Sequence, residues 1–397
     1  MTIARHARTL VRRQLLAVVL VSGVAAAPAV RLDAQRAVAA GTSPLSTSDF
    51  ASLVQQLSDS GGYFDTDNLI SSERSYLHAL TYFDRIGVRG GAYIGVGPDQ
   101  NFSYIARVRP EIVFIVDIRR DNQLHHLLLK ALFALSQNRA EFLARWTGRP
   151  VPANVDAYGT RDIDALVNLI DASQPTAASQ HSALSAVTAE VQRDGLHLTA
   201  ADLATIARFH QAFLDSGLSL RVTSTGRAPQ SHYPTLRQLL QERDLNGQRS
   251  SYLASEVDFR FLKSLQRRNL VIPLVGDLAS PRTLPAIGAE LRARGLSVSV
   301  LYTSNVEDYL LRDGRFPAYA AVVRRLPRTE RSVLVRSLFG GPMSHSRSVP
   351  GYYSTQLLQS LAAFSTEPDL AAVRSYRELA QRWFIPRSLL ACPLSST

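Results

Sequence analysis

Two glycines and an aspartate have the spacing of a nucleoside-binding turn. The stretch "GAYIGVGPDQN" places Gly95 and Gly97 between a predicted strand and a predicted helix, and Asp117 ends the next apolar run, 20 residues after Gly97. Glycines let the backbone approach a ligand closely, and an acidic side chain at the end of the following strand accepts hydrogen bonds from ribose hydroxyls. The sequence equally allows a purely structural turn, in which Asp117 pairs with Arg119 or Arg120.

The charge of this turn restricts the kind of ligand. The dinucleotide fingerprint requires a third glycine where this chain has Gln100, and the neighbouring Asp99 would repel a pyrophosphate at the positive end of a helix. NAD is therefore disfavoured. S-adenosylmethionine (SAM) suits an acidic turn better, because it carries a sulfonium cation and an amine and no phosphate. The predicted cofactor contacts are Gly95, Gly97, Asp99, Asn101 and Asp117.

Two further acidic residues follow separate predicted strands. Asp277 comes after "NLVIPLVG", and Glu307 comes after "LSVSVLYTSNV". Because the carboxyl ends of parallel strands share one edge of a sheet, we expect both carboxylates to face the crevice beside the glycine turn, where each could act as a catalytic general base on a hydroxyl or amine. Ser304 and Asn305 are the predicted substrate contacts, and the same pair could instead cap the following helix.

The chain offers little for metal or thiol chemistry. Cys392 is the single cysteine, so neither an intrachain disulfide nor a cysteine metal cluster can form. The adjacent His125 and His126 would point about 100° apart on a helix and would make a poor metal pair. We therefore predict no metal site.

The net charge of +11 comes almost entirely from arginine, because Lys130 and Lys263 are the only lysines. The arginines are scattered and do not form a basic stripe with interleaved aromatic residues. Nucleic-acid binding is therefore not expected, and the predicted partner is a small-molecule ligand. No pattern in the sequence determines the oligomeric state.

Residues 1–39 have the layout of a secretory signal peptide and leader. Four arginines precede the apolar run of residues 15–30, which ends in small residues, so cleavage is expected between Ala27 and Ala39. The protein would then be exported to the periplasm or envelope, with no membrane span after cleavage. A buried first helix and an uncleaved membrane anchor are the two alternatives.

The rest of the chain divides into three parts. Residues 40–150 are predicted to hold N-terminal helices and the first half of a sheet domain, residues 151–265 a helical insertion or cap, and residues 266–397 the second half of the sheet with C-terminal helices. The predicted strands are apolar and rich in β-branched residues, which is typical of a parallel sheet covered on both faces. The predicted fold class is α/β, with a mostly parallel sheet and a helical insertion.

Individual helices can be placed from their patterns. Apolar spacing predicts helices over Glu73–Phe83 and Gln123–Trp146, and the helix near residue 200 begins with a capping box formed by Thr199 and Asp202. A shorter helix, "DFASLVQQLS", precedes them near residue 50. These helices would cover the faces of the sheet.

Several stretches resemble a bacterial family of uncharacterised exported proteins. They are "GGAYIGVGPDQNFSYIA", "FIVDIRRDN", "KALFALSQNRAEFL", "PLVGDLAS" and "LYTSNVEDYLL", and the resemblance covers roughly residues 64–339. The family is similar in fold to class I SAM-dependent methyltransferases, so the resemblance implies a Rossmann-like, methyltransferase-like sheet. The chain departs from the methyltransferase glycine motif by having Asp99 where a third glycine is usual.

Two functions are compatible with these observations. The first is a SAM-dependent methyltransferase of unknown acceptor, with the glycine turn and Asp117 holding the cofactor and Asp277, Asn305 and Glu307 facing the acceptor. The second is an exported, non-catalytic ligand-binding protein that keeps a methyltransferase-like fold. Export favours the second function, because SAM is made in the cytosol.

Overall fold

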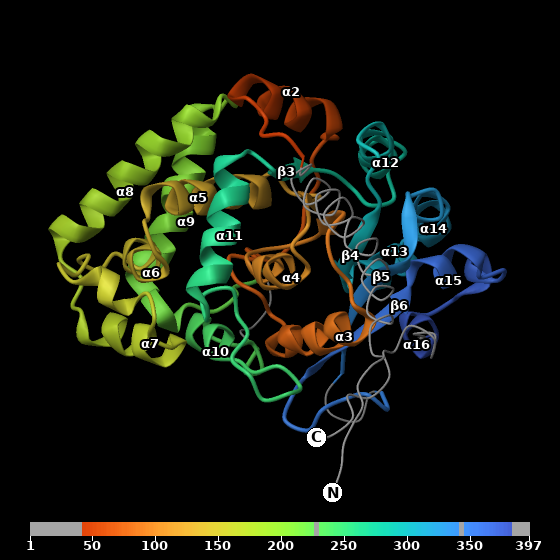
Figure 1. Cartoon of the computed structure of the whole chain (residues 1–397). Coiled ribbons are helices and arrows are strands. Elements are labelled where there is room, and N and C mark those ends of the chain that lie inside the picture. Colours follow the sequence, from red (N-terminus) through yellow and green to blue (C-terminus); the bar gives the residue numbers. More distant parts are fainter. Residues whose placement is uncertain (1–41, 226–229, 341–344, 383–397) are drawn as a thin grey trace, which may run out of the picture. The chain divides into compact units, whose positions relative to one another are not determined.

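One mixed sheet organises the protein. A computed structural model describes residues 42–225, 230–340 and 345–382 (Figure 1). The strands of this part are β1 Ala92–Gly95, β2 Ile112–Asp117, β3 Val271–Val275, β4 Val298–Ser304, β5 Arg328–Phe339 and β6 Ser354–Ser360. They lie in the order β3-β2-β1-β4-β5-β6; neighbouring strands from β3 to β5 are parallel, and β6 is antiparallel to β5.

Strands far apart in the sequence pair directly. In the β2–β3 pair, Val113 lies opposite Val271 and Asp117 lies opposite Val275. The prediction that the strand ending at Asp117 and the strand preceding Asp277 belong to one sheet is therefore confirmed. Every residue of β1 and β3 is buried, as expected for apolar strands covered on both faces.

Helices cover both faces of the sheet. Before β2 the helical segments are α2 Thr47–Leu57, η1 Arg74–Leu77, α3 His78–Ile86 and α4 Gln100–Val108. Between β2 and β3 they are α5 Arg120–Leu135, α6 Arg139–Trp146, η2 Val155–Tyr158, α7 Ile163–Ala172, α8 Ala177–Val191, η3 Gln192–Asp194, α9 Ala200–Ser216, η4 Gly217–Ser219, α10 Leu236–Leu240 and α11 Glu256–Arg267. After β3 they are α12 Thr283–Ala293, α13 Val306–Arg312, α14 Phe316–Val323, α15 Leu361–Thr366, η5 Leu370–Ala372 and α16 Tyr376–Gln381.

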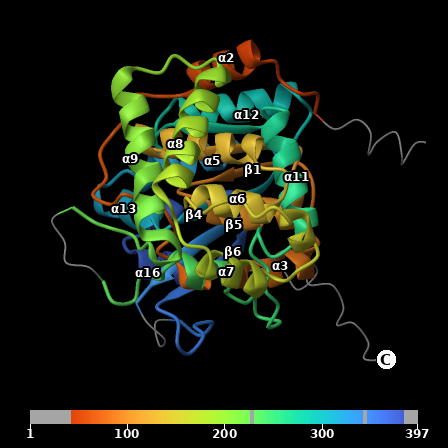
Figure 2. The same ribbon diagram turned by 90° about the vertical axis from the view of Figure 1, so that its left-hand side faces the viewer.

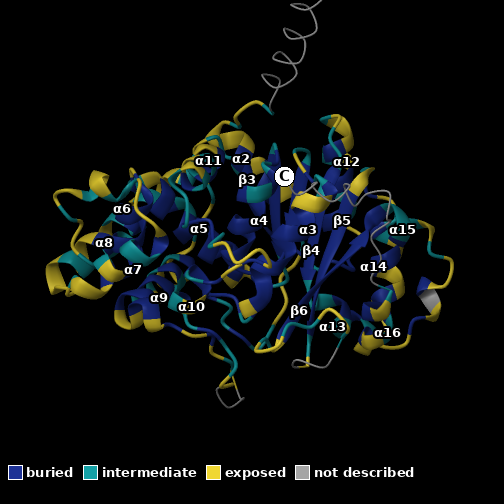
Figure 3. Cartoon of the chain, turned by 60° about the horizontal axis from the view of Figure 1, so that its bottom comes forward, coloured by how far each residue is buried: buried dark blue, intermediate teal, exposed yellow. Residues whose placement is uncertain are grey.

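The helices divide between the two faces according to their place in the chain. Helices α3, α4, α5 and α11 lie on one side of the sheet and α12 and α14 on the other (Figure 1). Helices α8 and α9 pack on the outside of α5 (Figure 2). The strands lie in the buried interior, and most exposed residues are on the outer helices and loops (Figure 3). No described helix is both long and apolar enough to span a membrane.

Helix ends follow local hydrogen bonding. The capping box predicted for α9 is confirmed, because the Thr199 hydroxyl accepts from the Asp202 N–H while the Asp202 carboxylate accepts from the Thr199 N–H. The single helix predicted over Gln123–Trp146 is wrong. The chain breaks between α5 and α6, where the Asn138 side chain accepts from the first N–H groups of α6 and starts a new helix.

Two features of the sequence lie outside the described residues. They are the predicted signal peptide and leader, residues 1–39, and the single cysteine, Cys392. The described residues from Pro44 onward form one compact unit.

Candidate functional site

A cavity of about 490 Å3 opens at the carboxyl ends of four parallel strands. The residues that line it directly after β1, β2, β3 and β4 include Gly97, Ile118, Asp277 and Asn305. Its position is where the strand order reverses, because the chain moves outward from β1 to β3 and then resumes with β4 on the other side of β1. In open α/β sheets this is the usual place for a ligand.

The glycine turn after β1 is held by Asn101. Its amide nitrogen donates to the carbonyl oxygens of Val96, at 2.8 Å, and Pro98, at 2.7 Å, and its amide oxygen accepts from the Tyr93 hydroxyl at 2.7 Å. Gly97 has a φ of +80°, which favours glycine. Asn101 is fully buried and does not line the cavity, so it shapes the turn and would not contact a cofactor directly.

Gly95 has a packing role beside the same side chain. A Cβ atom at this position would collide with the Asn101 amide oxygen and the Tyr93 ring, so only glycine fits. Gly95 does not line the cavity, whereas Gly97 does. Of the two predicted glycine contacts, the structure places one at the cavity.

His126 forms a hydrogen bond with the backbone of the glycine turn. Its Nε2 atom lies 2.9 Å from the Gly97 carbonyl oxygen, which can only accept, so the ring donates from Nε2. Burial lowers the pKa of His126 to about 4, because the imidazolium would be poorly solvated there. The ring is therefore neutral at pH 7 and acts as a fixed donor to the turn.

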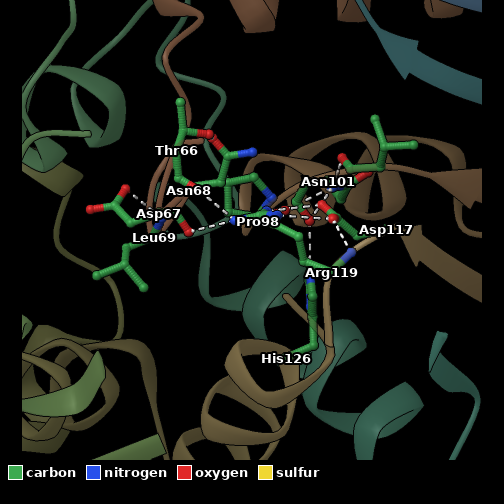
Figure 4. A network of polar contacts seen from close by, with 11 residues as sticks. Thr66, Asp67, Asn68, Leu69, Pro98, Asn101, Asp117, Arg119 and His126 are labelled. Carbon is green, nitrogen blue, oxygen red and sulfur yellow. Dashed lines mark hydrogen bonds and ion pairs between the residues drawn. The ribbon is translucent and has the colours of Figure 1, made fainter. Parts of the chain in front are cut away.

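Asp117 and Arg119 connect the sheet edge to the segment that covers it. We call residues 59–73 the strap. Both oxygens of Asp117 accept from Arg119, with the Nη2–Oδ2 distance at 3.0 Å, and Arg119 Nη1 donates to the Thr66 carbonyl at 2.6 Å and to the Asp67 carbonyl at 3.1 Å (Figure 4). The structural pairing of Asp117 with Arg119 is thus present, and Asp117 lines the cavity as well.

Asp99 does not contribute to the cavity, contrary to the prediction. Its carboxylate is buried, with 5% of the residue exposed, and accepts from the Tyr252 hydroxyl at 3.2 Å. Burial raises its pKa from the ordinary 3.8 to about 7. The side chain does not line the cavity, so it cannot select the charge of a ligand through direct contact.

The predicted catalytic and substrate residues separate into two groups. Asp277, Ser304 and Asn305 line the cavity, and Asp277 forms an ion pair with Arg315 near its rim. Glu307 does not line it. The prediction that Glu307 faces the crevice is therefore wrong.

Glu307 is instead fully buried against Arg336. Its two oxygens accept from Arg336 Nε at 2.6 Å and Nη2 at 3.2 Å, and both side chains are 0% exposed. Asn305 precedes α13, and Val306, Tyr309 and Leu310 of this helix line the cavity at helical spacing, so they form one face of it. Glu307 lies about 100° from Val306 around the helix axis, off that face, and its side chain enters the core.

A buried carboxylate that the sequence analysis did not single out lies at the cavity. Glu73 lines it and is 2% exposed. It accepts from the hydroxyls of Tyr302, at 2.9 Å, and Ser304, and on its other oxygen from the hydroxyl of Ser337 and the amide of Gln356. The sequence signal for Glu73 was only its place at the start of a predicted helix, which reads as an ordinary first-turn acid.

The lining is strongly acidic. Its carboxylates are Asp65, Glu73, Asp117, Asp277 and Asp313, and its single cation is Arg315. Apolar groups such as Val96, Ile118 and Leu278 form much of the remaining wall, and the rings of Phe64 and Tyr309 meet edge to face at 5.1 Å. The site is therefore suited to a small ligand with an apolar body and a cationic or hydrogen-bond-donating group.

Among the described residues, no group of three or more His, Cys, Asp and Glu side chains has an arrangement that could hold a metal ion.

No curated protein matches the chain. A family model with the description "Domain of unknown function (DUF7790)" matches residues 76–212 and 211–383, which together cover both halves of the sheet and the helices between them. The chain belongs to this family of proteins that share a domain of unknown function.

Proposed function

We propose that the cavity binds SAM and that the protein is a methyltransferase of unknown acceptor. The observation that carries this proposal is the acidic lining at the reversal of strand order: of its five carboxylates, Asp117 pairs with Arg119 and Asp277 with Arg315, which leaves an excess of negative charge. An anionic cofactor such as NAD would be repelled there, whereas a ligand with a sulfonium and an amine would be attracted. The strand order also supports a Rossmann-like, methyltransferase-like classification of the sheet.

The donor and acceptor groups fit this cofactor. Asp117 lies at the end of β2 with oxygens already oriented by Arg119, so it would accept hydrogen bonds from ribose hydroxyls with its remaining lone pairs. The apolar wall formed by Val96, Ile118 and Leu278 would take the base. The cavity volume lies within the roughly 300–1,000 Å3 of small-molecule sites. Bound SAM would supply an electrophilic methyl group.

The residues near the rim would orient the acceptor. Asn305 offers both a donor and an acceptor, and Asp277 is held by Arg315. Of the two predicted general bases, Asp277 lines the cavity and Glu307 does not. Asp277 could take a proton from a hydroxyl or amine there. Holding the acceptor in line with an activated methyl group accelerates transfer mainly by proximity and orientation.

A second candidate is an exported ligand-binding protein without catalysis. The burial of Glu307 against Arg336 favours it, because one of the two predicted bases is thereby removed from the site. The predicted signal peptide also favours it. Location in the periplasm or envelope is part of this proposal.

Calorimetry with SAM, S-adenosylhomocysteine and NAD tests the binding proposal. The wild type should bind the adenosyl compounds and not NAD. The Asp117→Asn variant should have an affinity for SAM that is about tenfold to hundredfold lower, because it loses charge-assisted bonds of roughly 1.5–3 kcal/mol. Asp171→Asn is the matched control, because Asp171 also pairs with an arginine, Arg237, but lies outside the cavity. Absence of binding to both adenosyl compounds by the wild type would overturn the proposal.

Labelled methyl transfer separates the two candidates. Purified protein is incubated with methyl-labelled SAM and a cell-envelope extract, and label in non-SAM products is measured. Methyl transfer that falls with Asp277→Asn supports the enzyme. SAM binding without transfer to any component supports the binding protein.

A further inference from the structure

A second cavity, of about 530 Å3, opens near the amino end of β3, whereas the acidic cavity lies at the carboxyl ends of the strands. Its lining includes Arg267 and Asn269, which directly precede β3, whereas the acidic cavity is lined by residues that follow β3. The remaining walls come from the C-terminal half of α5, from η3 and from the first residue of α2. Helices α8 and α11 flank α5 in this region (Figure 2). We call this cavity the basic groove.

Both lysines of the chain line the basic groove. Lys130 forms an ion pair with Asp194, and Arg193 pairs with Glu190. Two further cations, Lys263 and Arg267, line the same cavity, so four cations face two carboxylates. The groove therefore has an excess of positive charge.

The excess charge belongs to Lys263 and Arg267. Neither forms an ion pair within the part of the chain that the structure describes. The carboxylates nearest to Lys263 are Glu141 and Glu256, and these pair with other arginines. Burial and the neighbouring Arg267 lower the pKa of Lys263, as expected where two like charges lie close together.

Gln266 adds an unsatisfied polar group to the same cavity. The residue is 3% exposed, and neither its amide nitrogen nor its amide oxygen has a hydrogen-bond partner among the described residues. Buried amides are almost always paired, because leaving one unpaired costs about 1–3 kcal/mol. A ligand in the groove that accepts a hydrogen bond would satisfy the amide N–H.

Helix ends account for only part of this arrangement. The Lys263 ammonium donates to the Ser136 carbonyl at the C-terminal end of α5, where a cation also interacts favourably with the helix dipole. Arg267 is the last residue of α11, so it also lies where a helix dipole favours a cation. Helix ends do not explain why the two cations face the same cavity without a carboxylate partner among the described residues, or why the amide of Gln266 is unsatisfied there.

We propose that the basic groove binds a phosphate-bearing anion. Lys263 and Arg267 supply the two uncompensated charges, and the guanidinium offers the paired N–H groups that match phosphate oxygens. The Gln266 amide supplies a neutral donor. The site is separate from the acidic cavity, so this proposal does not depend on SAM binding.

Pyrophosphate, titrated by calorimetry at fixed ionic strength, is the first probe. We expect binding by the wild type and about a tenfold or greater loss for Lys263→Met and for Arg267→Gln. The matched control is Arg325→Gln, which removes an exposed arginine that forms no ion pair among the described residues and lies outside the groove. A loss in the control equal to that in the groove variants would show general charge attraction and would overturn the proposal.

Gln266→Leu distinguishes ligand recognition from a structural role. Because the amide has no partner, leucine should leave the free energy of unfolding in urea unchanged or higher. The same variant should bind pyrophosphate more weakly. Unchanged affinity for pyrophosphate would contradict the assigned role of Gln266.

Vesicles identify the source of the phosphate. Sedimentation with phosphatidylglycerol vesicles, compared with phosphatidylcholine vesicles, tests a lipid headgroup, and pyrophosphate tests a soluble ligand. Binding to either that depends on Lys263 and Arg267 supports the basic groove. Binding to neither probe overturns the proposal for the basic groove. The affinity for SAM, measured in the same variants, should stay unchanged, so a failure here can be told apart from a failure of the proposal for the acidic cavity.

Discussion

Breaking the Glu307–Arg336 pair should destabilise the protein without changing its ligand site. Both side chains are fully buried, and Arg336 also donates to the Gln359 side chain at 2.9 Å. Burial alone would lower the pKa of Arg336, but the adjacent Glu307 carboxylate outweighs burial and raises it. Arg336 therefore keeps its charge in the folded protein.

The magnitude follows from this geometry. At 2.6 Å between Arg336 Nε and Glu307 Oε2, the attraction is about 6 kcal/mol with an effective dielectric constant of about 20. Much of this attraction offsets the cost of removing both charges from water. Removing only one partner leaves the other buried and uncompensated, so Glu307→Gln and Arg336→Met should each lower the free energy of unfolding by about 3–5 kcal/mol. That is a large share of the roughly 5–15 kcal/mol of a typical domain.

Urea denaturation of the wild type, both single variants and the double variant forms a complete cycle. The double variant should lose clearly less than the sum of the two single losses, because it leaves no unpaired buried charge. Ligand affinity of the folded Glu307→Gln protein should equal that of the wild type, since Glu307 does not line the acidic cavity. A Glu307→Gln protein with wild-type stability and no ligand binding would refute this reasoning and return Glu307 to the site.

Three further predictions concern the turn, a buried acid and the N-terminus. Asp99, whose pKa is raised to about 7, keeps its proton in the folded state while the unfolded chain loses it above about pH 4, so the free energy of unfolding should fall by up to about 4 kcal/mol between pH 4 and 7. Asp99→Asn should abolish this fall in urea denaturation series, and a persisting fall would assign it to other groups. Asn101→Ala removes the side-chain donor to the buried Val96 carbonyl and the acceptor of the buried Tyr93 hydroxyl, so it should cost about 2 kcal/mol or more while weakening ligand binding, as measured by urea denaturation and calorimetry. N-terminal sequencing should find a mature start between Ala27 and Ala39 in an envelope fraction, whereas an intact Met1 on cytosolic protein would contradict export.

The sheet was predictable because its signals are local. Apolar, β-branched runs gave the strands ending near Asp117 and Asp277, and their pairing followed from the need to cover both faces. The capping box of Thr199 and Asp202 was also predictable, since both of its partners lie within four consecutive residues. The break before Asn138 was missed because the flanking segments share one apolar period.

The acidic cavity was only partly predictable. Gly97, Asp117, Asp277 and Asn305 could be placed there because each ends or follows a strand. Glu73 could not, because its partners lie from 229 to 283 residues away and no local pattern brings them together.

The misplaced side chains have physical explanations of two kinds. Glu307 lies three residues after the end of β4 and already belongs to α13, where the helical period of about 100° per residue places it off the cavity-lining face of Val306 and Tyr309 and into the core. Asp99 begins a helix whose covering layer includes Tyr252, a residue far along the chain. The first error could have been avoided from the period alone, and the second could not.

In the proposed function, the strap would contribute to ligand choice together with the glycine turn. Of the five carboxylates in the acidic cavity, Asp65 and Glu73 come from the strap, although the sheet edge alone provides the glycine turn and Asp117. Arg119 joins the two, because it binds Asp117 on one side and the strap carbonyl groups on the other (Figure 4). A ligand that contacts both Asp117 and the strap therefore depends on one guanidinium for the placement of its partners. Under the proposed function, the same sheet with a differently charged strap would accept a different ligand, because the carboxylates of Asp65 and Glu73 add to the attraction of a cationic one.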